Sequence, residues 1–206
     1  TSSIPGEGKS FISANLAWSI ARTGKKVVLV DLDFRNPRLT RLFGAEGRIG
    51  ITDYLADDAR DEIEILQPTE HADLYLIPTG LHTENPTEIL LGERLPQLFN
   101  WIIFDSPPLL FAADASLLST LCHGTLLVVR IGHTTIDSVT RAMQSLCNNN
   151  VLGIVVNGAR RGELYSKYTY YHSYYTPKEG GDKEDEEMSG HAEGVAAESG
   201  EHSEES

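Results

Sequence analysis

Five short apolar segments alternate with segments of helical spacing, and this pattern limits the possible folds more than any other feature. The apolar segments are residues 26–31, 73–78, 101–105, 124–130 and 152–157. Apolar residues recur at helical spacing in residues 10–22, 86–98, 113–121 and 134–148. Because strands that alternate with helices form a mostly parallel sheet covered on both faces, we expect an α/β fold.

The first ten residues contain a phosphate-binding pattern. Residues 3–10 are Ser-Ile-Pro-Gly-Glu-Gly-Lys-Ser, which fits Walker A except that serine replaces the first glycine. Gly6 and Gly8 let backbone amides approach phosphates, and the following helix adds the positive end of its dipole. Lys9 would contact the β- and γ-phosphates, and Ser10 would offer a hydroxyl ligand to Mg²⁺. The same short pattern also arises by chance in turns, so it needs support from other elements.

A loop of this kind normally follows a buried β-strand. No apolar segment stands ahead of Thr1 in this sequence. We therefore expect the first strand of the P-loop sheet to belong to a longer chain, together with any membrane-spanning part.

Three aspartates stand at the ends of predicted strands. Asp31 ends the first apolar segment, Asp33 follows two residues later, and Asp105 ends a Walker B-like segment. Open α/β sheets bind ligands at the carboxyl ends of their strands, so the three carboxylates should converge beside Lys9. A single aspartate in such a position is often only a helix cap. Together with the phosphate-binding loop, however, the three predict a magnesium–nucleotide site.

After Asn157 the alternation stops and six tyrosines crowd into a polar segment. They are Tyr165, Tyr168, Tyr170, Tyr171, Tyr174 and Tyr175. Beyond them, residues 178–206 hold eleven acids and two lysines, which account for −9 of the formal net charge of −13. Such a segment buries almost nothing, and we expect it to be disordered. The predicted organisation is a P-loop domain (1–160), a tyrosine-rich segment (161–177) and an acidic tail (178–206).

Tyrosine clusters also serve as stacking platforms for single-stranded nucleic acid, but those platforms need a cationic groove. Lys167 is the only lysine or arginine within the cluster, and the chain as a whole is acidic. A basic footprint is missing, so we do not expect nucleic acid as a partner.

As a set, these motifs resemble the bacterial tyrosine kinases of the polysaccharide co-polymerase group, or BY-kinases. The resemblance extends from Thr1 to about Tyr175 and rests on residues 3–10, 30–37, 85–88, 103–108 and the tyrosine cluster. The related partitioning and cell-division-site ATPases share the sheet. They carry a signature lysine early in the loop, where this chain has Ile4, and they lack a terminal tyrosine cluster. Both differences favour the kinase.

The resemblance implies an ATP-dependent tyrosine autokinase that phosphorylates its tyrosine cluster and regulates exopolysaccharide export. It implies ATP and Mg²⁺ as cofactors. The residues expected to bind ATP are Pro5, Gly6, Glu7, Gly8, Lys9, Ser10, Phe11 and Asn157. The catalytic set is Lys9, Asp31, Asp33 and Asp105, and the metal ligands are Ser10, Asp33 and Asp105.

Several of these roles have alternatives. By resemblance, Asp31 is the base that accepts the phenolic proton or the group that orients the phenol, and the roles of the three aspartates are interchangeable on the sequence alone. Asn157 either contacts the adenine or is a polar cap at a strand end. Arg35 contacts phosphate or stabilises a neighbouring subunit. Trp101 is expected in the core, and His133 on the surface.

The resemblance also implies partners. These are a transmembrane polysaccharide co-polymerase, either fused upstream or separate, a homo-oligomeric ring, and a cognate tyrosine phosphatase, at the cytoplasmic face of the bacterial inner membrane. Each phosphotyrosine adds roughly −1.5 to −2 charges, so we expect phosphorylation to loosen the ring. The alternatives are an ATPase switch without kinase activity and a non-catalytic adaptor that docks on a membrane partner.

Overall fold

The computed structural model describes residues 1–56, 61–81, 94–146 and 151–159. The chain divides into two units, Thr1–Arg160 and Arg161–Ser206, and the described residues all belong to the first. The tyrosine cluster, the acidic tail and the 85–88 motif lie outside the described residues.

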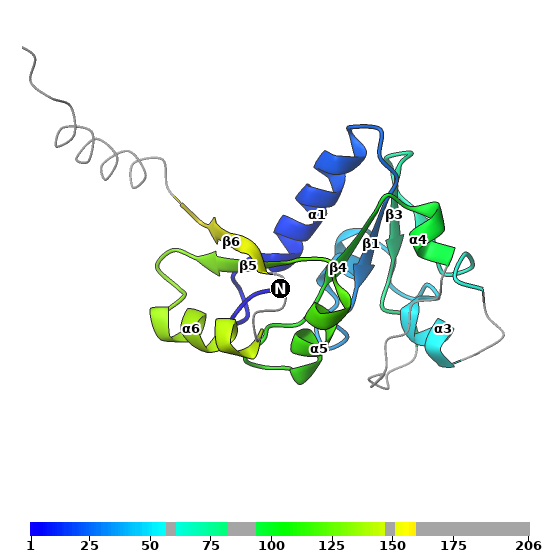
Figure 1. The fold of residues 1–206 in the computed structure, drawn as a ribbon. Coiled ribbons are helices and arrows are strands. Elements are labelled where there is room, and N and C mark those ends of the chain that lie inside the picture. The colour runs from blue at the N-terminus through cyan, green and yellow to red at the C-terminus, as the bar shows by residue number, and fades with distance from the viewer. Residues whose placement is uncertain (57–60, 82–93, 147–150, 160–206) are drawn as a thin grey trace, which may run out of the picture. The chain divides into compact units, whose positions relative to one another are not determined.

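The described residues contain two sheets, in the orders β2-β3-β1-β4 and β5-β6 (Figure 1). The strands are β1 (Val27–Asp31), β2 (Gln67–Pro68), β3 (Leu74–Ile77), β4 (Trp101–Asp105), β5 (Thr125–Arg130) and β6 (Val151–Asn157). Strand β2 pairs antiparallel to β3 at the edge, and the other pairs are parallel. The mostly parallel α/β fold expected from the sequence is therefore confirmed.

The described helices are α1 (Lys9–Ala21), α2 (Arg38–Leu42), α3 (Ile51–Ala56), α4 (Arg94–Leu98), α5 (Ala113–Leu121) and α6 (Ile136–Ser145). Helices α1, α5 and α6 lie in three of the four segments predicted to be helical. In the fourth, residues 86–98, the described residues form α4. Helices α2 and α3 and strand β2 were not predicted. Within the described ranges, we find no helix with the length and apolar character that crossing a bilayer requires.

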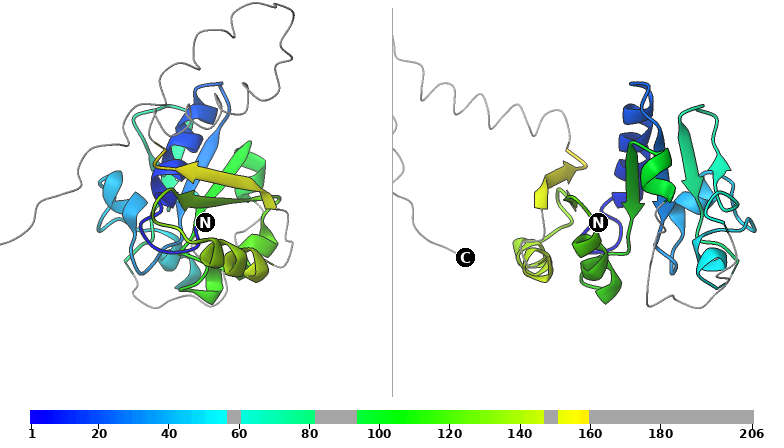
Figure 2. Two further views of the ribbon diagram at one scale, coloured as in Figure 1. Left: turned by 90° about the vertical axis from the view of Figure 1, so that its left-hand side faces the viewer. Right: turned by 45° about the vertical axis from the view of Figure 1, so that its right-hand side comes forward.

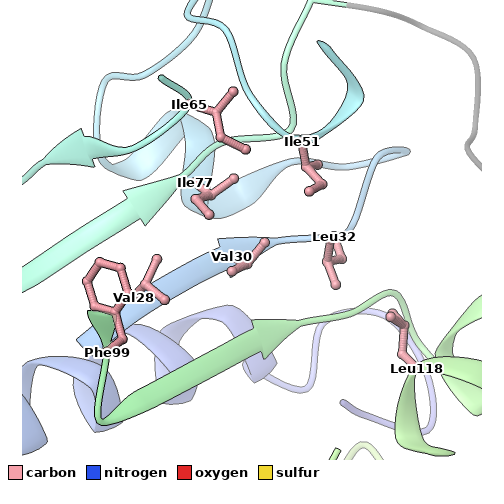
Figure 3. Close-up of a cluster of buried hydrophobic side chains, with 8 residues drawn as sticks. All are labelled: Val28, Val30, Leu32, Ile51, Ile65, Ile77, Phe99 and Leu118. Carbon is pink, nitrogen blue, oxygen red and sulfur yellow. The ribbon is translucent and has the colours of Figure 1, made fainter. Parts of the chain in front are cut away.

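Strand β1 lies in the middle of the four-stranded sheet, and all five of its residues are buried. Its two faces pack into different clusters. Figure 3 shows the first cluster, which consists of Val28, Val30, Leu32, Ile51, Ile65, Ile77, Phe99 and Leu118. On the other face, Val27 and Leu29 pack with Ala17 and Ala21 of α1. Because each fully buried aliphatic side chain contributes about 1.5–3 kcal/mol, this double coverage holds the carboxyl end of β1 firmly in place.

The first two residues lie between the segment that follows β4 and strand β5. Leu109 N–H donates to the Ser2 carbonyl oxygen at 2.8 Å, and Val128 N–H donates to that of Thr1 at 2.9 Å. Ser2 and Val128 form a parallel bridge. These bonds place the phosphate-binding loop between the two sheets, at the carboxyl ends of their strands. The strand expected ahead of the loop stays a prediction.

Two backbone segments cross at the carboxyl end of β3 with no room for a side chain. A Cβ atom at Gly50 would collide with the Pro78 carbonyl oxygen and lie 2.5 Å from the Gly80 nitrogen. One at Gly80, where φ is +101°, would collide with the side chains of Thr52 and Asp53. The Gly50 N–H also donates to Asp53 Oδ2 at 2.7 Å. The crossing therefore requires glycine on both segments.

Candidate active site

Lys9 is the first residue of α1, and its ammonium group lies against a carboxylate from the loop after β1. Lys9 Nζ is 2.7 Å from Asp33 Oδ2 and 3.4 Å from Ser10 Oγ. Lys9 is 8% exposed and Asp33 is 4% exposed. A charge that is withdrawn from water is tolerated when it is paired, so each of the two side chains depends on the other.

Asp31 is the last residue of β1 and is fully buried. Its Oδ2 accepts hydrogen bonds from Thr40 N–H at 2.8 Å and from the Thr40 hydroxyl at 2.9 Å. Its Oδ1 accepts a longer bond of 3.3 Å from Asp33 N–H. Burial raises the pKa of Asp31 to about 6, although the Thr40 hydrogen bonds act in the opposite direction. The carboxyl group is therefore held in one orientation and titrates close to neutral pH.

Asp105 ends β4 and is the register partner of Asp31 on the neighbouring strand. Its Oδ1 accepts a hydrogen bond from Ser13 Oγ at 3.3 Å. Its Oδ2 is buried and has no hydrogen-bond partner in the described part of the chain. Burial raises the pKa of Asp105, and the nearby Lys9 charge lowers it in part. A buried carboxylate oxygen without a partner is rare in proteins and indicates a position for a donor or a cation.

The phosphate-binding loop leads into α1 through two glycines with positive φ, +84° at Gly6 and +95° at Gly8. A Cβ atom at Gly8 would collide with the side-chain amide of Asn157. Asn157 Nδ2 donates to the Glu7 carbonyl oxygen at 2.9 Å, and its Oδ1 accepts from Gly158 N–H at 2.8 Å. Asn157 thus holds the backbone of the loop, and its contact with adenine stays a prediction.

Residues that the sequence analysis did not predict hold the same loop. Arg130 ends β5, and its Nη1 donates to the Gly6 carbonyl oxygen at 3.2 Å. Thr134 donates its hydroxyl to the Glu7 carboxylate. Arg130 ends a predicted strand, and Thr134 lies in the segment after it. A position at the carboxyl end of a strand is also the criterion that selected the aspartates. Applied to polar residues of every strand end, that criterion would have found Arg130.

The remaining predicted residues lie at the margin of this site. Phe11 projects from α1 and is 64% exposed. Arg35 is exposed, and its Nη1 donates to the carbonyl oxygen of Phe111, in the segment after β4, at 2.9 Å. No group of three or more His, Cys, Asp or Glu side chains gathers as a metal site among the described residues. Magnesium bound beside phosphates needs only one or two protein carboxylates, so the small donor set is compatible with it.

Comparison with known proteins identifies the family. The family model of the CobQ/CobB/MinD/ParA nucleotide binding domain matches residues 4–171. The tyrosine-protein kinase YwqD of Bacillus subtilis is 34% identical over 180 residues, which cover 83% of this chain and 75% of YwqD. The chain belongs to the bacterial tyrosine-protein kinases.

Other relatives agree with this family. The kinase domain is 34% identical to the tyrosine-protein kinase Wzc of Salmonella typhimurium over 182 residues, 83% of this chain but only 25% of Wzc. The solved kinase domain of Escherichia coli tyrosine kinase ETK superposes with a TM-score of 0.69 and 30% identity, and the match covers 78% of this chain and 66% of that structure. The resemblance inferred from the motifs is confirmed.

Proposed function

We propose that this kinase domain transfers the γ-phosphoryl group of ATP to the tyrosines of its own C-terminal cluster. The observation that carries the proposal is the gathering of Lys9, Asp31, Asp33 and Asp105 at the start of α1 and the carboxyl ends of β1 and β4. Phosphoryl transfer needs positioned positive charge and a proton acceptor, and this cluster contains both. The acceptors would be Tyr165, Tyr168, Tyr170, Tyr171, Tyr174 and Tyr175.

The residues at the site fit ATP and Mg²⁺. The buried Asp105 Oδ2, which has no hydrogen-bond partner among the described residues, is an oxygen that a cation would satisfy. Ser10, Asp33 and Asp105 would hold Mg²⁺, and Asp105 would contribute this Oδ2. Residues 5–11 and Asn157 would hold ATP. Bound Mg-ATP supplies the phosphoryl group, and the metal offsets charge on the phosphates.

Lys9 is the residue we assign to the phosphates. Its ammonium lies 2.7 Å from Asp33 Oδ2, at the first residue of the helix that follows the loop. The Asp33 carboxylate keeps this charge beside the loop, and a bound triphosphate would attract the ammonium in addition. Lys9 would then neutralise charge that develops on the phosphoryl oxygens during transfer.

Asp31 is the residue we assign to the tyrosine. A phenol of pKa about 10 keeps its proton at neutral pH and needs an acceptor. Burial raises the pKa of Asp31 to about 6, so the carboxylate is ionised at pH 7 and close to the value at which a base works best. Because Oδ2 is engaged twice by Thr40, we assign proton acceptance to Oδ1, whose hydrogen bond is longer.

The proposed setting is the cytoplasmic face of a bacterial membrane, where the domain would act with a transmembrane polysaccharide co-polymerase in exopolysaccharide export. The chain covers 75% of YwqD and 25% of Wzc, so relatives of very different length share this domain. This difference supports both a fused and a separate membrane partner. A homo-oligomeric ring, loosened by phosphorylation and reset by a phosphatase, completes the proposal.

Intact-mass measurement after incubation of the full chain with Mg-ATP tests the proposed reaction. We expect phosphate additions that map to residues 165–175. Lys9→Ala should slow them by about 100-fold or more, since it removes the charge beside the phosphates. Lys25→Ala, at an exposed lysine after α1, is the matched control.

The alternatives give different outcomes in the same experiment. Consumption of ATP without added mass would indicate an ATPase switch. Binding without consumption would indicate an adaptor. Either result, obtained also in the presence of the membrane partner, would overturn the kinase proposal.

A further inference from the structure

Glu7 is fully buried although it belongs to a phosphate-binding loop. Its Oε2 accepts a hydrogen bond from Ile4 N–H at 2.8 Å, across the turn of the loop. Its Oε1 accepts from the hydroxyl of Thr134, 127 residues away in the sequence. A buried carboxylate is strongly unfavourable unless its oxygens are hydrogen-bonded, so the conformation of Glu7 depends on both donors.

The turn between β5 and α6 fixes the direction in which Thr134 donates. The Thr134 hydroxyl oxygen accepts from Arg130 N–H at 2.8 Å, and Thr134 N–H donates to the Arg130 carbonyl oxygen at 2.9 Å. The turn is therefore closed by two bonds between the same residues. A hydroxyl has one hydrogen to donate, and here that hydrogen is directed at the Glu7 carboxylate.

The carbonyl groups of the loop are held from the same side. Arg130 Nη1 donates to the Gly6 carbonyl oxygen at 3.2 Å, and His133 Nε2 lies 3.3 Å from that of Pro5. The Glu7 carbonyl oxygen accepts from Asn157 Nδ2 at 2.9 Å. The carbonyl oxygens of Pro5, Gly6 and Glu7 thus face, in that order, the turn after β5, the end of β5 and the end of β6.

This arrangement has a consequence for the amides of the loop. In a planar trans peptide, the C=O of one residue and the N–H of the next point in opposite directions. Holding the carbonyls of residues 5–7 on one side therefore turns the N–H groups of residues 6–8 to the other side. Those are the groups that a phosphate would contact.

We infer that Glu7 and Thr134 are positioning residues, through which the turn between β5 and α6 sets the orientation of the phosphate-binding loop and hence the affinity for ATP. The inference rests on the nucleotide site proposed above. Neither side chain touches the reacting atoms. Both act through the backbone of the loop, so their loss should raise the KM for ATP with little change in kcat.

Thr134→Val tests this inference in the full chain, because it keeps the shape of the side chain and removes the hydroxyl. We expect the KM for ATP and the Kd for Mg-ATP to rise roughly tenfold, since a buried carboxylate loses one donor. Thr134→Ser should restore both values to within about threefold, because its hydroxyl can make the same bond. Thr140→Val is the matched control: its hydroxyl donates to the Ile136 carbonyl oxygen within α6 at 2.9 Å.

Glu7→Gln gives an independent test. The amide presents one acceptor oxygen and one NH₂ group, so it cannot accept from both Ile4 N–H and Thr134. We expect the KM for ATP and the Kd for Mg-ATP to rise at least as much as in Thr134→Val. Because the two changes break one shared interaction, the double variant should bind ATP about as weakly as the weaker single variant.

Amide hydrogen exchange without nucleotide separates this inference from the kinase proposal. Exchange in residues 3–9 should speed up about threefold or more in Thr134→Val, because a looser loop opens more often, and not in Thr140→Val. If the wild-type chain binds Mg-ATP without phosphorylating tyrosine, the kinase proposal fails and this inference stands. If Thr134→Val matches Thr140→Val in both exchange and KM, the inference is wrong. A Thr134→Ser variant as impaired as Thr134→Val would also overturn it.

Discussion

The four-stranded sheet and the β5–β6 pair are covered very differently. Every residue of β1 is buried, with one cluster on each face. Strand β6 alternates instead, and the side chains of Leu152, Ile154 and Val156 are 70%, 47% and 56% exposed. Figure 2 shows α6 and the β5–β6 pair from two further directions.

The two regions also contribute differently to the site. The four-stranded sheet ends in Asp31 and Asp105, the carboxylates assigned to the chemistry. The β5–β6 pair supplies Arg130 and Asn157, which bond to the backbone of the phosphate-binding loop. The four-stranded sheet positions the carboxylates, and the β5–β6 pair holds the conformation of the phosphate-binding loop. Asp31 is carried by β1, the strand with the most complete packing, whereas Asp105 ends β4, whose other residues are partly exposed.

The same substitution in each sheet tests the difference in packing. Leu29→Ala, at a side chain that is 0% exposed, should lower the free energy of unfolding by about 2–5 kcal/mol, since it leaves a cavity. Leu152→Ala, at 70% exposure, should lower it by about 0.5 kcal/mol or less. Urea denaturation followed by circular dichroism measures both. Equal losses would show that the two sheets are equally well covered.

Gly8 lies where the two regions meet, and Gly8→Ala tests how closely they fit. Alanine at φ +95° costs about 1–2 kcal/mol, and its Cβ also collides with the Asn157 amide. Gly44→Ala is the control, because Gly44 has φ +63° with no neighbour within 4 Å of a Cβ. We expect weaker ATP binding by about tenfold in Gly8→Ala alone, measured by calorimetry. Adding Asn157→Ala should restore part of the stability, since it removes the collision but not the strain.

The pH dependence of stability tests the carboxylate at the end of β1. Burial raises the pKa of Asp31 in the folded chain to about 6, above its value in the unfolded chain, so the folded state holds this proton more tightly. The contribution of Asp31 to the free energy of unfolding is therefore largest at low pH and is lost as the pH rises through 6. From pH 5 to pH 7, the free energy of unfolding of Asp31→Asn should therefore rise by about 1 kcal/mol relative to that of the wild type.

Chemical denaturation across that pH range measures the gain, with Asp137→Asn on the exposed start of α6 as the matched control. A wild-type chain that follows Asp31→Asn in parallel from pH 5 to 7 would show that Asp31 titrates outside that range.

The five parallel strands could be predicted from the sequence because buried parallel strands are continuous apolar runs. Strand β2 could not, because it has only two residues and pairs antiparallel at the edge. Helices α2 and α3 could not, since five or six residues are too few to show a helical period. Trp101 shows the limit of the same rule. It begins β4 in an apolar run and was expected in the core, yet it is 52% exposed, so that expectation was wrong.

The site divides in the same way. Its aspartates could be predicted because the end of a strand is a position that the sequence reveals. The bond between Glu7 and Thr134 could not, because it joins residues that only the folded chain brings together. The hydrogen bonds of Thr40 to Asp31 are of the same kind. Sequence reasoning finds residues that carry charge at strand ends more readily than the neutral residues that orient them.

The crossing of Gly50 and Gly80 limits how this domain can be re-engineered. The Thr79 N–H beside it donates to the Thr40 hydroxyl at 3.1 Å, and Thr40 in turn binds Asp31. A single methyl group at either glycine would push the two segments apart and transmit that displacement to the Asp31 carboxylate through two hydrogen bonds. Chimeras and mutant libraries of this domain should therefore keep both glycines, and should exchange the two crossing segments together.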